Sequence, residues 1–382
     1  MKFDVIFVGA GPAGYFAAYE LNKLQPSLKI ALIDGGNSIE KRRCPVLEHK
    51  IKKCPLNTKG YSECYPACSI TNGFGGAGLK LLRSKVRHLG TEENLKILTK
   101  ISNYLNERIS MFFGTKVQDI IVEDNTVKGV VLADGRSFEA DYVSLSVGRE
   151  GSKWLAEVLE KRGVNMTQTQ VDIGVRVECP NLVMEEINDN LYEGKFLYQT
   201  SNGNVVRTFC SNPGGHVVVE NYEGVVNVNG HSYSDSKLSS KNTNFALLVS
   251  HHFSEPFKAP NEYAKKVSSL ANQLACGGVI VQRYGDIKLG RRSTEKRIKE
   301  GFVRPTLTEA VPGDLTLCMP QKTMEAIIEM IQILDKVTPG IATEHTLLYG
   351  VEAKYYSAHP DINNDLEVSE IKNLLVGGDS AG

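Results

Sequence analysis

Hydrophobic residues near the N-terminus predict strands that alternate with a helix. The stretch FDVIFVGAG, residues 3–11, begins with an apolar run that is typical of a buried parallel strand. A helix is expected from residue 12, and the second apolar run LKIALID, residues 28–34, predicts the next strand. This order favours an α/β domain with a Rossmann-like parallel sheet.

A different pattern follows at residues 109–148. Three alternating strands are predicted there, joined by turns at Asp124-Asn125 and Asp134-Gly135, and the last strand ends in DYVSLSVG. A domain that binds only NAD would normally continue with strand and helix units. The segment instead predicts a β-meander.

Alternation of apolar and polar residues dominates from about residue 171 to residue 340. Turns rich in Asn, Gly and Pro separate stretches such as VDIGVRVE, GNVVRTFC, GGHVVVENY, GVVNVNGHSY, NFALLVSHHF and VIVQRYGDIK, which predict an antiparallel or mixed sheet. One amphipathic helix is expected over residues 323–337, before Pro339 and Gly340. Its apolar stripe is interpreted as core packing and consists of Met324, Ile327, Ile328, Ile331 and Leu334.

These patterns divide the chain into three parts. Residues 1–170 are predicted to form the first part of a dinucleotide-binding domain, residues 171–340 an inserted α+β lid domain, and residues 341–382 the return to the first domain. The predicted fold class is therefore α/β with an inserted α+β domain.

The first strand is followed by glycines at the spacing GxGxxG, namely Gly9, Gly11 and Gly14. In such a motif the first glycine permits a tight turn, the second lets a pyrophosphate approach the backbone, and the third lets helix and strand pack closely. Asp34 follows Gly14 by twenty residues, where a carboxylate can accept hydrogen bonds from a ribose. The sequence predicts a dinucleotide site formed by Gly9, Gly11, Pro12, Ala13, Gly14, Asp34 and Gly35; the alternative is a glycine-rich turn before a core helix.

The meander and the C-terminus resemble the FAD domain of glutathione-reductase-like flavoproteins. In that resemblance the backbone near Val117 holds the adenine, and Gly148 passes close to the cofactor. The stretch EIKNLLVGGDSAG, residues 370–382, looks like the last FAD motif, in which Gly378 precedes Asp379 and Asp379 faces the ribityl hydroxyls of the flavin. The FAD domain would then be discontinuous; the alternative for Asp379 is a surface turn.

Further motifs are spread along nearly the whole chain and include EKRRCP, CSITNGFGGAG, VRHLGTE, NTNFALLVS, GRRST and TLLYGVEAKYYS. In combination they resemble the uncharacterised bacterial FAD-dependent dehydrogenases, distant relatives of the aminoacetone-oxidase-like flavoproteins. The resemblance implies a bound FAD and a redox activity, with NAD(P)H as a transient electron donor and no established substrate.

The chain departs from this family in two places. Members of the family carry several dozen residues between the GFGGAG loop and the segment that resembles GLKLLRSKVRHLG, and they continue past the GD motif into a further helix. We therefore hypothesise that FAD binding is weakened here, because a helix N-terminus supplies pyrophosphate donors.

Four cysteines, Cys44, Cys54, Cys64 and Cys68, precede the glycine-rich loop. They are separated by nine, nine and three residues, so no CxxC pair is present. Zinc or an iron–sulfur cluster, a redox-active thiol set and plain loop cysteines all remain open, and no metal is predicted. Arg42 and Arg43 are candidates for pairing with the FAD phosphates, or form an exposed basic turn.

Candidates for a substrate pocket lie in the later part of the chain. His231 is a possible proton donor or a structural histidine, and Arg291 and Arg292 would bind an anionic substrate or belong to a solvated turn. Glu352 and Lys354 are expected to share one face of a strand. No residue is identified as catalytic.

Composition narrows the choice of function. The chain has 44 basic and 44 acidic residues, so its formal net charge is zero and it has no overall attraction for nucleic acid. No apolar run reaches ~18 residues and no signal peptide is evident, so a cytoplasmic protein is expected. The leading hypothesis is an FAD-dependent oxidoreductase that transfers a hydride between the flavin and a small molecule. The alternatives are an FAD-dependent enzyme that modifies tRNA, and an inactive fragment of the fold.

Overall fold

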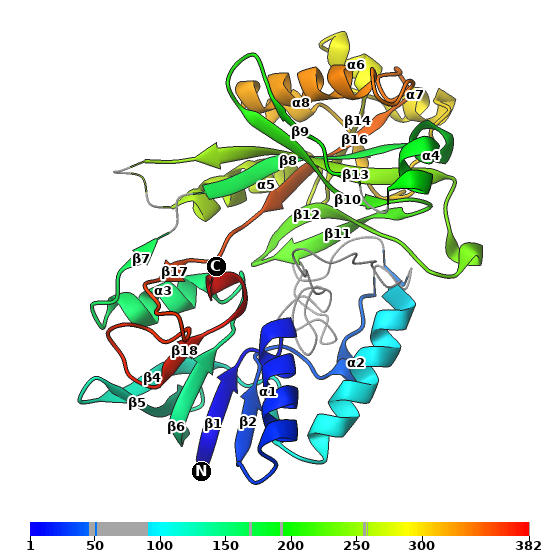
Figure 1. The fold of residues 1–382 in the computed structure, drawn as a ribbon. Helices are drawn as coiled ribbons and strands as arrows, with labels where there is room; N and C mark the ends of the chain where they lie inside the picture. The colour runs from blue at the N-terminus through cyan, green and yellow to red at the C-terminus, as the bar shows by residue number, and fades with distance from the viewer. Residues whose placement is uncertain are drawn as a thin grey trace.

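The chain folds into two lobes, each built around a β-sheet (Figure 1). The computed structural model describes residues 1–45, 50–51, 91–167, 170–191, 194–254, 257 and 259–381. The helices are α1 (Pro12–Leu24), α2 (Thr91–Asn106), α3 (Ser152–Glu160), α4 (Asn181–Asn190), α5 (Pro260–Leu274), α6 (Tyr284–Lys288), α7 (Glu295–Glu300) and α8 (Gln321–Leu334). Short 3₁₀ segments are η1 (Ile39–Lys41), η3 (Ser236–Leu238), η4 (Leu315–Leu317) and η5 (Gly378–Ala381).

The first lobe contains a seven-stranded sheet. Its strands are β1 (Lys2–Val8), β2 (Ile30–Ile33), β3 (Ser110–Phe112), β4 (Val117–Glu123), β5 (Thr126–Leu132), β6 (Ser137–Leu145) and β18 (Leu374–Val376). The order is β3-β2-β1-β6-β5-β4, and β18 also pairs with β6. Strands β3, β2, β1, β6 and β18 run parallel, whereas β4 and β5 form the antiparallel meander. The predicted α/β fold with a β-meander is confirmed.

Strand β18 brings the end of the chain into the same sheet as its beginning. Leu374, Leu375 and Val376 lie opposite residues 143–145 of β6, and β6 lies beside β1 on its other side. The carboxyl ends of β1, β6 and β18 therefore meet at one edge, which is where ligands bind in parallel sheets.

The second lobe is built on another seven-stranded sheet, with the order β15-β14-β16-β8-β13-β10-β9. Its strands are β8 (Gln170–Pro180), β9 (Leu197–Gln199), β10 (Val205–Asn212), β13 (Asn242–His252), β14 (Ile280–Arg283), β15 (Val311–Pro312) and β16 (Leu347–Lys354). All neighbours are antiparallel except β14 and β15. The expected mixed sheet is present.

One face of this second sheet is apolar and the other is polar. Along β8, Val171, Ile173, Val175, Val177 and Cys179 pack into a core with α5 and α8. The predicted stripe of α8 packs there too, since Met324, Ile327, Ile331 and Leu334 are buried and Ile328 is partly buried. The alternate residues of β8, which include Asp172, Arg176 and Glu178, therefore occupy the opposite face and are also buried.

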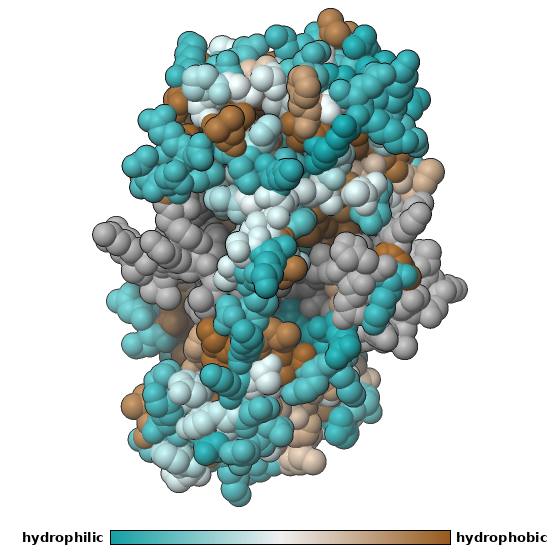
Figure 2. Space-filling view, turned by 90° about the vertical axis from the view of Figure 1, so that its right-hand side faces the viewer, coloured by the Kyte–Doolittle hydropathy of each residue, from teal (hydrophilic) through white to brown (hydrophobic). Residues whose placement is uncertain are grey.

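The hairpin of β11 (His216–Tyr222) and β12 (Val225–His231) lies between the second sheet and the first lobe (Figure 1). A further pair, β7 (Met166–Thr167) and β17 (His359–Pro360), marks the two points where the chain passes between the lobes. The surface on the α2 side of Figure 1 is mainly hydrophilic, with a gathering of hydrophobic residues on the lower lobe (Figure 2).

Two details differ from the sequence prediction. Strand β16 pairs with β8 and β14, so the second sheet extends past the predicted boundary at residue 340. The predicted strand over residues 279–288 ends at Arg283, because the following residues form α6. Asp286 of α6 is buried and accepts hydrogen bonds from Arg291 and Ser293, which hold this segment as a single helical turn.

Candidate functional site

The turn between β1 and α1 is closed by contacts that only glycine permits. Gly9 has φ +101°, and a Cβ atom there would lie 2.3 Å from the carbonyl oxygen of Ser146, directly after β6. A Cβ atom on Gly14 would lie 1.9 Å from the carbonyl oxygen of Gly9. These two glycines therefore allow the turn, the first helical turn of α1 and the end of β6 to touch.

Gly11 differs from its two neighbours in the motif. Among the described residues, no atom lies within 4 Å of the position that a Gly11 Cβ would take, and Gly11 is the N-cap of α1. Pro12 follows as a first-turn residue, where a missing N–H costs nothing. The first turn of a helix leaves N–H groups without partners inside the helix, and its dipole favours an anion. The open space at Gly11 thus fits a pyrophosphate.

Asp34 directly follows β2 and is fixed by the backbone. Its carboxylate accepts hydrogen bonds from the N–H groups of Ala10 and Gly36, both at 2.7 Å. Burial raises the pKa of the Asp34 carboxyl, although these two N–H groups and the positive charge of Arg42 oppose the shift. The carboxylate is therefore held at the β1–α1 turn, beside Arg42.

Gly35 and Val117 lie at the same edge of the sheet as Asp34. The Thr115 N–H donates to the Asp34 carbonyl oxygen at 3.0 Å, two residues before Val117 begins β4. A Cβ atom on Gly35 would lie 3.2 Å from the side chain of Lys116. The meander therefore starts beside the predicted ribose carboxylate, and the adenine contact at Val117 stays a prediction.

The C-terminal motif approaches the glycine turn from the other side. A Cβ atom on Gly378, which has φ +75°, would lie 3.3 Å from the Cβ of Ala13. Asp379 accepts a hydrogen bond from the Ser357 N–H at 3.1 Å and lies 3.8 Å from the Nε of Arg149, which follows Gly148. The predicted sites near the two ends of the chain are thus brought together.

Two buried hydroxyl groups belong to residues next to Asp379. Ser380 follows Asp379 in the chain, and the N–H of Ser357 donates a hydrogen bond to Asp379. The Oγ atoms of Ser357 and Ser380 are both buried and have no hydrogen-bond partner among the described residues. Buried polar groups are normally hydrogen-bonded. Two buried hydroxyls without a hydrogen-bond partner among the described residues, beside a candidate cofactor site, therefore fit a polar ligand there. The residues present therefore fit FAD, and the individual contacts stay predictions.

An apolar cavity adjoins this region on the α1 side of the sheet. Its volume is about 670 Å³, and its lining includes Phe7, Leu21, Tyr142, Leu375 and Gly378. Most of the lining is hydrocarbon, so the cavity does not offer the donors that a pyrophosphate needs. Of the residues predicted from the sequence to bind the cofactor, the cavity lining includes Ala13 and Gly378.

The remaining candidates near the N-terminus are only partly described. Arg43 is exposed and Cys44 is partly exposed, whereas Cys54, Cys64 and Cys68 lie outside the described residues. Within the part of the chain that the structure describes, no group of three or more His, Cys, Asp or Glu side chains is arranged to hold a metal ion.

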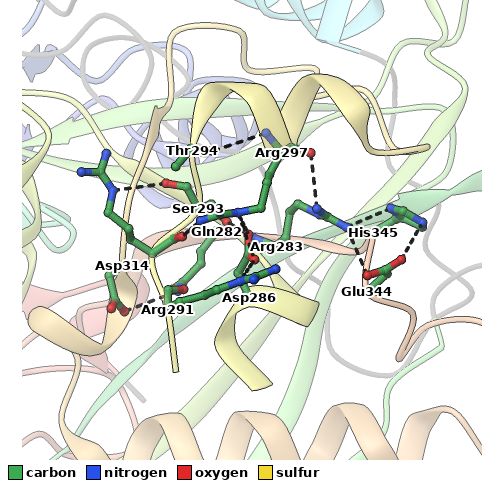
Figure 3. A network of polar contacts seen from close by, with 11 residues as sticks. Gln282, Arg283, Asp286, Arg291, Ser293, Thr294, Arg297, Asp314, Glu344 and His345 are labelled. Atoms are coloured by element: carbon green, nitrogen blue, oxygen red, sulfur yellow. Dashed lines mark hydrogen bonds and ion pairs between the residues drawn. The ribbon is translucent and has the colours of Figure 1, made fainter. Parts of the chain in front are cut away.

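Arg291 belongs to a structural network in the second lobe (Figure 3). Its Nε donates to the Asp286 carboxylate at 2.7 Å, and the Ser293 hydroxyl donates to the same carboxylate at 2.7 Å. The Arg297 Nε lies 3.2 Å from Asp286. Burial works to raise the pKa of Asp286, but these donors outweigh it and lower the pKa. Arg291 is thus paired with Asp286, and Arg292 contacts the carbonyl oxygen of Ser293.

Glu352 takes part in a second network, on the polar face of the second sheet. The fully buried Arg176 donates to both carboxylate oxygens of Glu352, at 2.7 and 2.8 Å. Arg176 also donates to the Asn229 side-chain oxygen at 2.9 Å, and the Asn229 amide donates to Glu220 at 2.6 Å. Burial raises the pKa of Glu352 to about 7, although Arg176 opposes the shift.

His231 lies at the end of the β12 strand that covers this network. Its Nδ1 is buried and has no hydrogen-bond partner among the described residues. Burial lowers the pKa of His231, which favours the neutral imidazole. Arg176 was missed from the sequence, although the polar residues that alternate along VDIGVRVE signal a polar sheet face.

Comparison with known proteins supports an FAD-dependent protein. Residues 170–355 match the model of the family described as FAD-dependent protein, C-terminal domain-like. That description agrees with the prediction of FAD as the cofactor, and the matched range agrees with the second lobe as the structure has it. An uncharacterized protein of Clostridium beijerinckii is 27% identical over 432 aligned positions, which cover 100% of this chain and 77% of that protein. The alignment has about 50 positions more than this chain has residues, so that protein contains stretches without a counterpart here.

Other similarities are partial or distant. The tRNA uridine 5-carboxymethylaminomethyl modification enzyme MnmG of Ureaplasma urealyticum is 24% identical over 218 residues, which cover 48% of this chain and 35% of that enzyme. PqsL of Pseudomonas aeruginosa, described as a probable FAD-dependent monooxygenase, is 13% identical with a TM-score of 0.38, and the match covers 100% of this chain and 79% of PqsL. Among the described helices, none has the length and apolar character that crossing a membrane requires.

Proposed function

We propose that this protein is an FAD-dependent oxidoreductase that acts on a small molecule. The observation that carries the proposal is the meeting of the glycine turn with the C-terminal GD motif, because Ala13 and Gly378 are neighbours although they lie near opposite ends of the chain. The match of the second lobe to an FAD-dependent family supports it independently.

Each part of the site has a task in this proposal. Gly11 and the N-terminus of α1 would receive the pyrophosphate, Asp34 would bind the ribose, and Asp379 would bind the ribityl chain. Gly148 and Val117 would contact the flavin and adenine ends. Bound FAD would supply the chemistry by accepting a hydride from the substrate or from NAD(P)H.

The second lobe would supply the substrate surface. Its β11–β12 hairpin and the polar face of its sheet turn toward the first lobe, and burial there excludes water from the Arg176–Glu352 pair. Burial raises the pKa of Glu352 to about 7, whereas the Arg176 guanidinium that donates to both of its oxygens favours the ionised form. We therefore propose the Arg176–Glu352 pair as part of the polar surface that this lobe turns toward the substrate.

The test is a visible absorption spectrum of the purified protein after incubation with FAD and removal of the excess. Flavin bands are expected, and anaerobic addition of NADH or NADPH should bleach them. The Asp379→Asn variant should bind less FAD than the matched control Asp365→Asn, because Asp365 is exposed and is not part of the motif. A protein that ignores added FAD, with or without these substitutions, would contradict the proposal.

A second candidate is a flavoprotein that modifies RNA, which the partial similarity to MnmG favours. It requires a surface that attracts phosphates, whereas the chain as a whole has no net charge. The measurement is a gel-shift titration with total tRNA at two salt concentrations. Salt-dependent binding would support this candidate, and its absence together with bleaching by NAD(P)H would favour the small-molecule oxidoreductase.

A further inference from the structure

Three positively charged side chains surround one phenylalanine ring in the second lobe. The Lys354 Nζ lies 4.0 Å, the Arg207 Cζ 4.9 Å and the Lys195 Nζ 5.8 Å from the centre of the Phe209 ring. Lys354 also lies 5.3 Å from the centre of the Tyr356 ring. We call Lys195, Arg207, Phe209, Lys354 and Tyr356 the Phe209 cluster.

Strand register places this cluster on the polar face of the second sheet. Lys354 lies opposite Asp172 of β8, two positions along β16 from Glu352. Since side chains alternate along a strand, Lys354 shares the face of Glu352 that turns toward the first lobe. Arg207 and Phe209 likewise share one face of β10, and their contacts with Asp172 and Lys354 show that it is this same face.

A buried carboxylate anchors the cluster. Asp172 accepts hydrogen bonds from the Nη2 of Arg207 and from the Tyr356 hydroxyl, the latter at 2.6 Å. Burial works to raise the pKa of Asp172, but these hydrogen bonds outweigh it and lower the pKa. Asp172 therefore stays ionised and holds the Arg207 guanidinium by one nitrogen.

Arg207 retains unused donors. Its Nη2 makes the contacts with Asp172 and Tyr356, whereas its Nε is buried and has no partner among the described residues, and its Nη1 makes no hydrogen bond there. The side chain is 28% exposed. A guanidinium fixed from one side with donors left over, next to an ammonium group, is suited to bind a carboxylate. Phe209 and Tyr356 add flat apolar surface beside it.

The cluster also lies close to the candidate FAD site. Tyr356 is followed directly by Ser357, and the Ser357 N–H donates to Asp379, the predicted ribityl contact. A molecule bound at the cluster would thus contact Tyr356, the neighbour in the chain of Ser357, whose N–H bonds the predicted ribityl contact Asp379.

We propose that the Phe209 cluster binds the carboxylate of a small organic acid with a planar or aromatic body. The inference that this acid is the substrate rests on the proposed function, whereas the anion binding itself does not. Arg207 and Lys354 pair with the carboxylate, and the rings of Phe209 and Tyr356 contact the body of the acid.

Calorimetric titration of the purified protein with benzoate and with benzamide tests the proposal, because the two probes share a shape and differ in charge. Benzoate should bind at least about tenfold more tightly than benzamide. Lys354→Met should weaken benzoate binding by about tenfold or more, and Arg207→Lys should weaken it while leaving a cation beside Asp172. Lys128→Met is the matched control, since Lys128 is exposed on β5 in the first lobe.

The outcomes separate this inference from the proposed function. Equal affinity for benzoate and benzamide, absence of benzoate binding, or unchanged binding in Lys354→Met with retained stability would each overturn the anion site. The titration is run with and without added FAD. Benzoate binding without any flavin spectrum would support the site and contradict the oxidoreductase, whereas a flavin spectrum without benzoate binding would contradict the site alone.

Discussion

Gly11 and Gly14 lie three residues apart, yet their surroundings differ, because Gly14 is packed against the Gly9 backbone and Gly11 is not. A Cβ atom at position 14 would overlap the Gly9 carbonyl oxygen, whereas a Cβ atom at position 11 would have no atom of the described residues within 4 Å. We predict that Gly14→Ala lowers the free energy of unfolding of the FAD-free protein by about 1–3 kcal/mol, as overpacking does. Gly11→Ala should leave that stability nearly unchanged and should weaken FAD binding.

Urea unfolding of both FAD-free variants measures the first effect, and FAD titration measures the second. The two variants control for each other, because each makes the same chemical change. Equal losses of stability in Gly11→Ala and Gly14→Ala would contradict the assignment of separate tasks to the two glycines.

Glu352 predicts a specific dependence of stability on pH. Its pKa is raised by burial from 4.5 to about 7, so the folded protein binds this proton more tightly than the unfolded chain does. The resulting stabilisation is complete below pH 4.5 and is lost as the pH rises through about 7. Glu352→Gln carries a permanent neutral amide and should remove this dependence.

The measurement compares the free energy of unfolding of wild type and Glu352→Gln across that pH range. The difference between the two proteins should change steadily from pH 4.5 to about 7 and level off above it. Glu157→Gln, at an exposed position of α3, should follow the wild type. Parallel curves for wild type and Glu352→Gln would show that Glu352 titrates as it does in the unfolded chain.

At the residue scale, short-range motifs were predictable and long-range partners were not. Gly9, Gly14 and Asp34 could be recognised because their contacts are local or set by a known spacing. Arg176 and Glu352 are 176 residues apart, and the sequence pattern of either strand does not indicate that the two side chains form an ion pair. Arg291 has a local partner, Asp286, but its pairing depends on α6, which was predicted as a strand.

At the scale of elements, α8 shows how an amphipathic helix stabilises the second lobe. Ile331 is fully buried against the sheet core, whereas Lys322 of the same helix is exposed. We predict that Ile331→Ala lowers the free energy of unfolding by about 2–5 kcal/mol, because it leaves a cavity in this core. Lys322→Ala should change it by less than about 0.5 kcal/mol.

Denaturant unfolding of both variants tests this difference. A loss for Ile331→Ala no larger than that for Lys322→Ala would mean that α8 does not pack on the sheet as described. The helix itself was predictable from its 3.6-residue periodicity, and the observed α8 begins two residues earlier and ends three residues earlier than the predicted range. Its partners, β8, β10 and β13, were predictable as strands but not as neighbours of α8.

At the scale of the whole molecule, the chain passes from the second lobe to the first after the end of β16 (Figure 1). The Ser357 N–H donates to Asp379 and the Ala358 N–H donates to the Ser152 hydroxyl, so two successive residues, which begin three positions after the end of β16, bond the connection to the first lobe. The return of the chain to the first sheet could be expected from the GD motif. The position of the return could not, because β16 alternates like the other strands and nothing local marks the crossing.

This arrangement predicts how FAD should affect the stability of the intact chain. A ligand that binds only the folded state raises the free energy of unfolding by about 2.7 kcal/mol at a hundred times its dissociation constant. Because the predicted site joins β1, β2, β6 and β18, the gain should raise the melting temperature of the first lobe and, through the Ser357–Asp379 bond, that of the connection to the second lobe.

Asp379→Asn should lose most of this FAD-dependent rise and keep a near-normal melting temperature without FAD, because an amide oxygen can still accept from Ser357. Asp365→Asn should retain the full rise, and differential scanning calorimetry with and without FAD measures all three proteins. A rise in Asp379→Asn equal to that of the wild type would remove Asp379 from the cofactor site and leave the glycine turn as its main support.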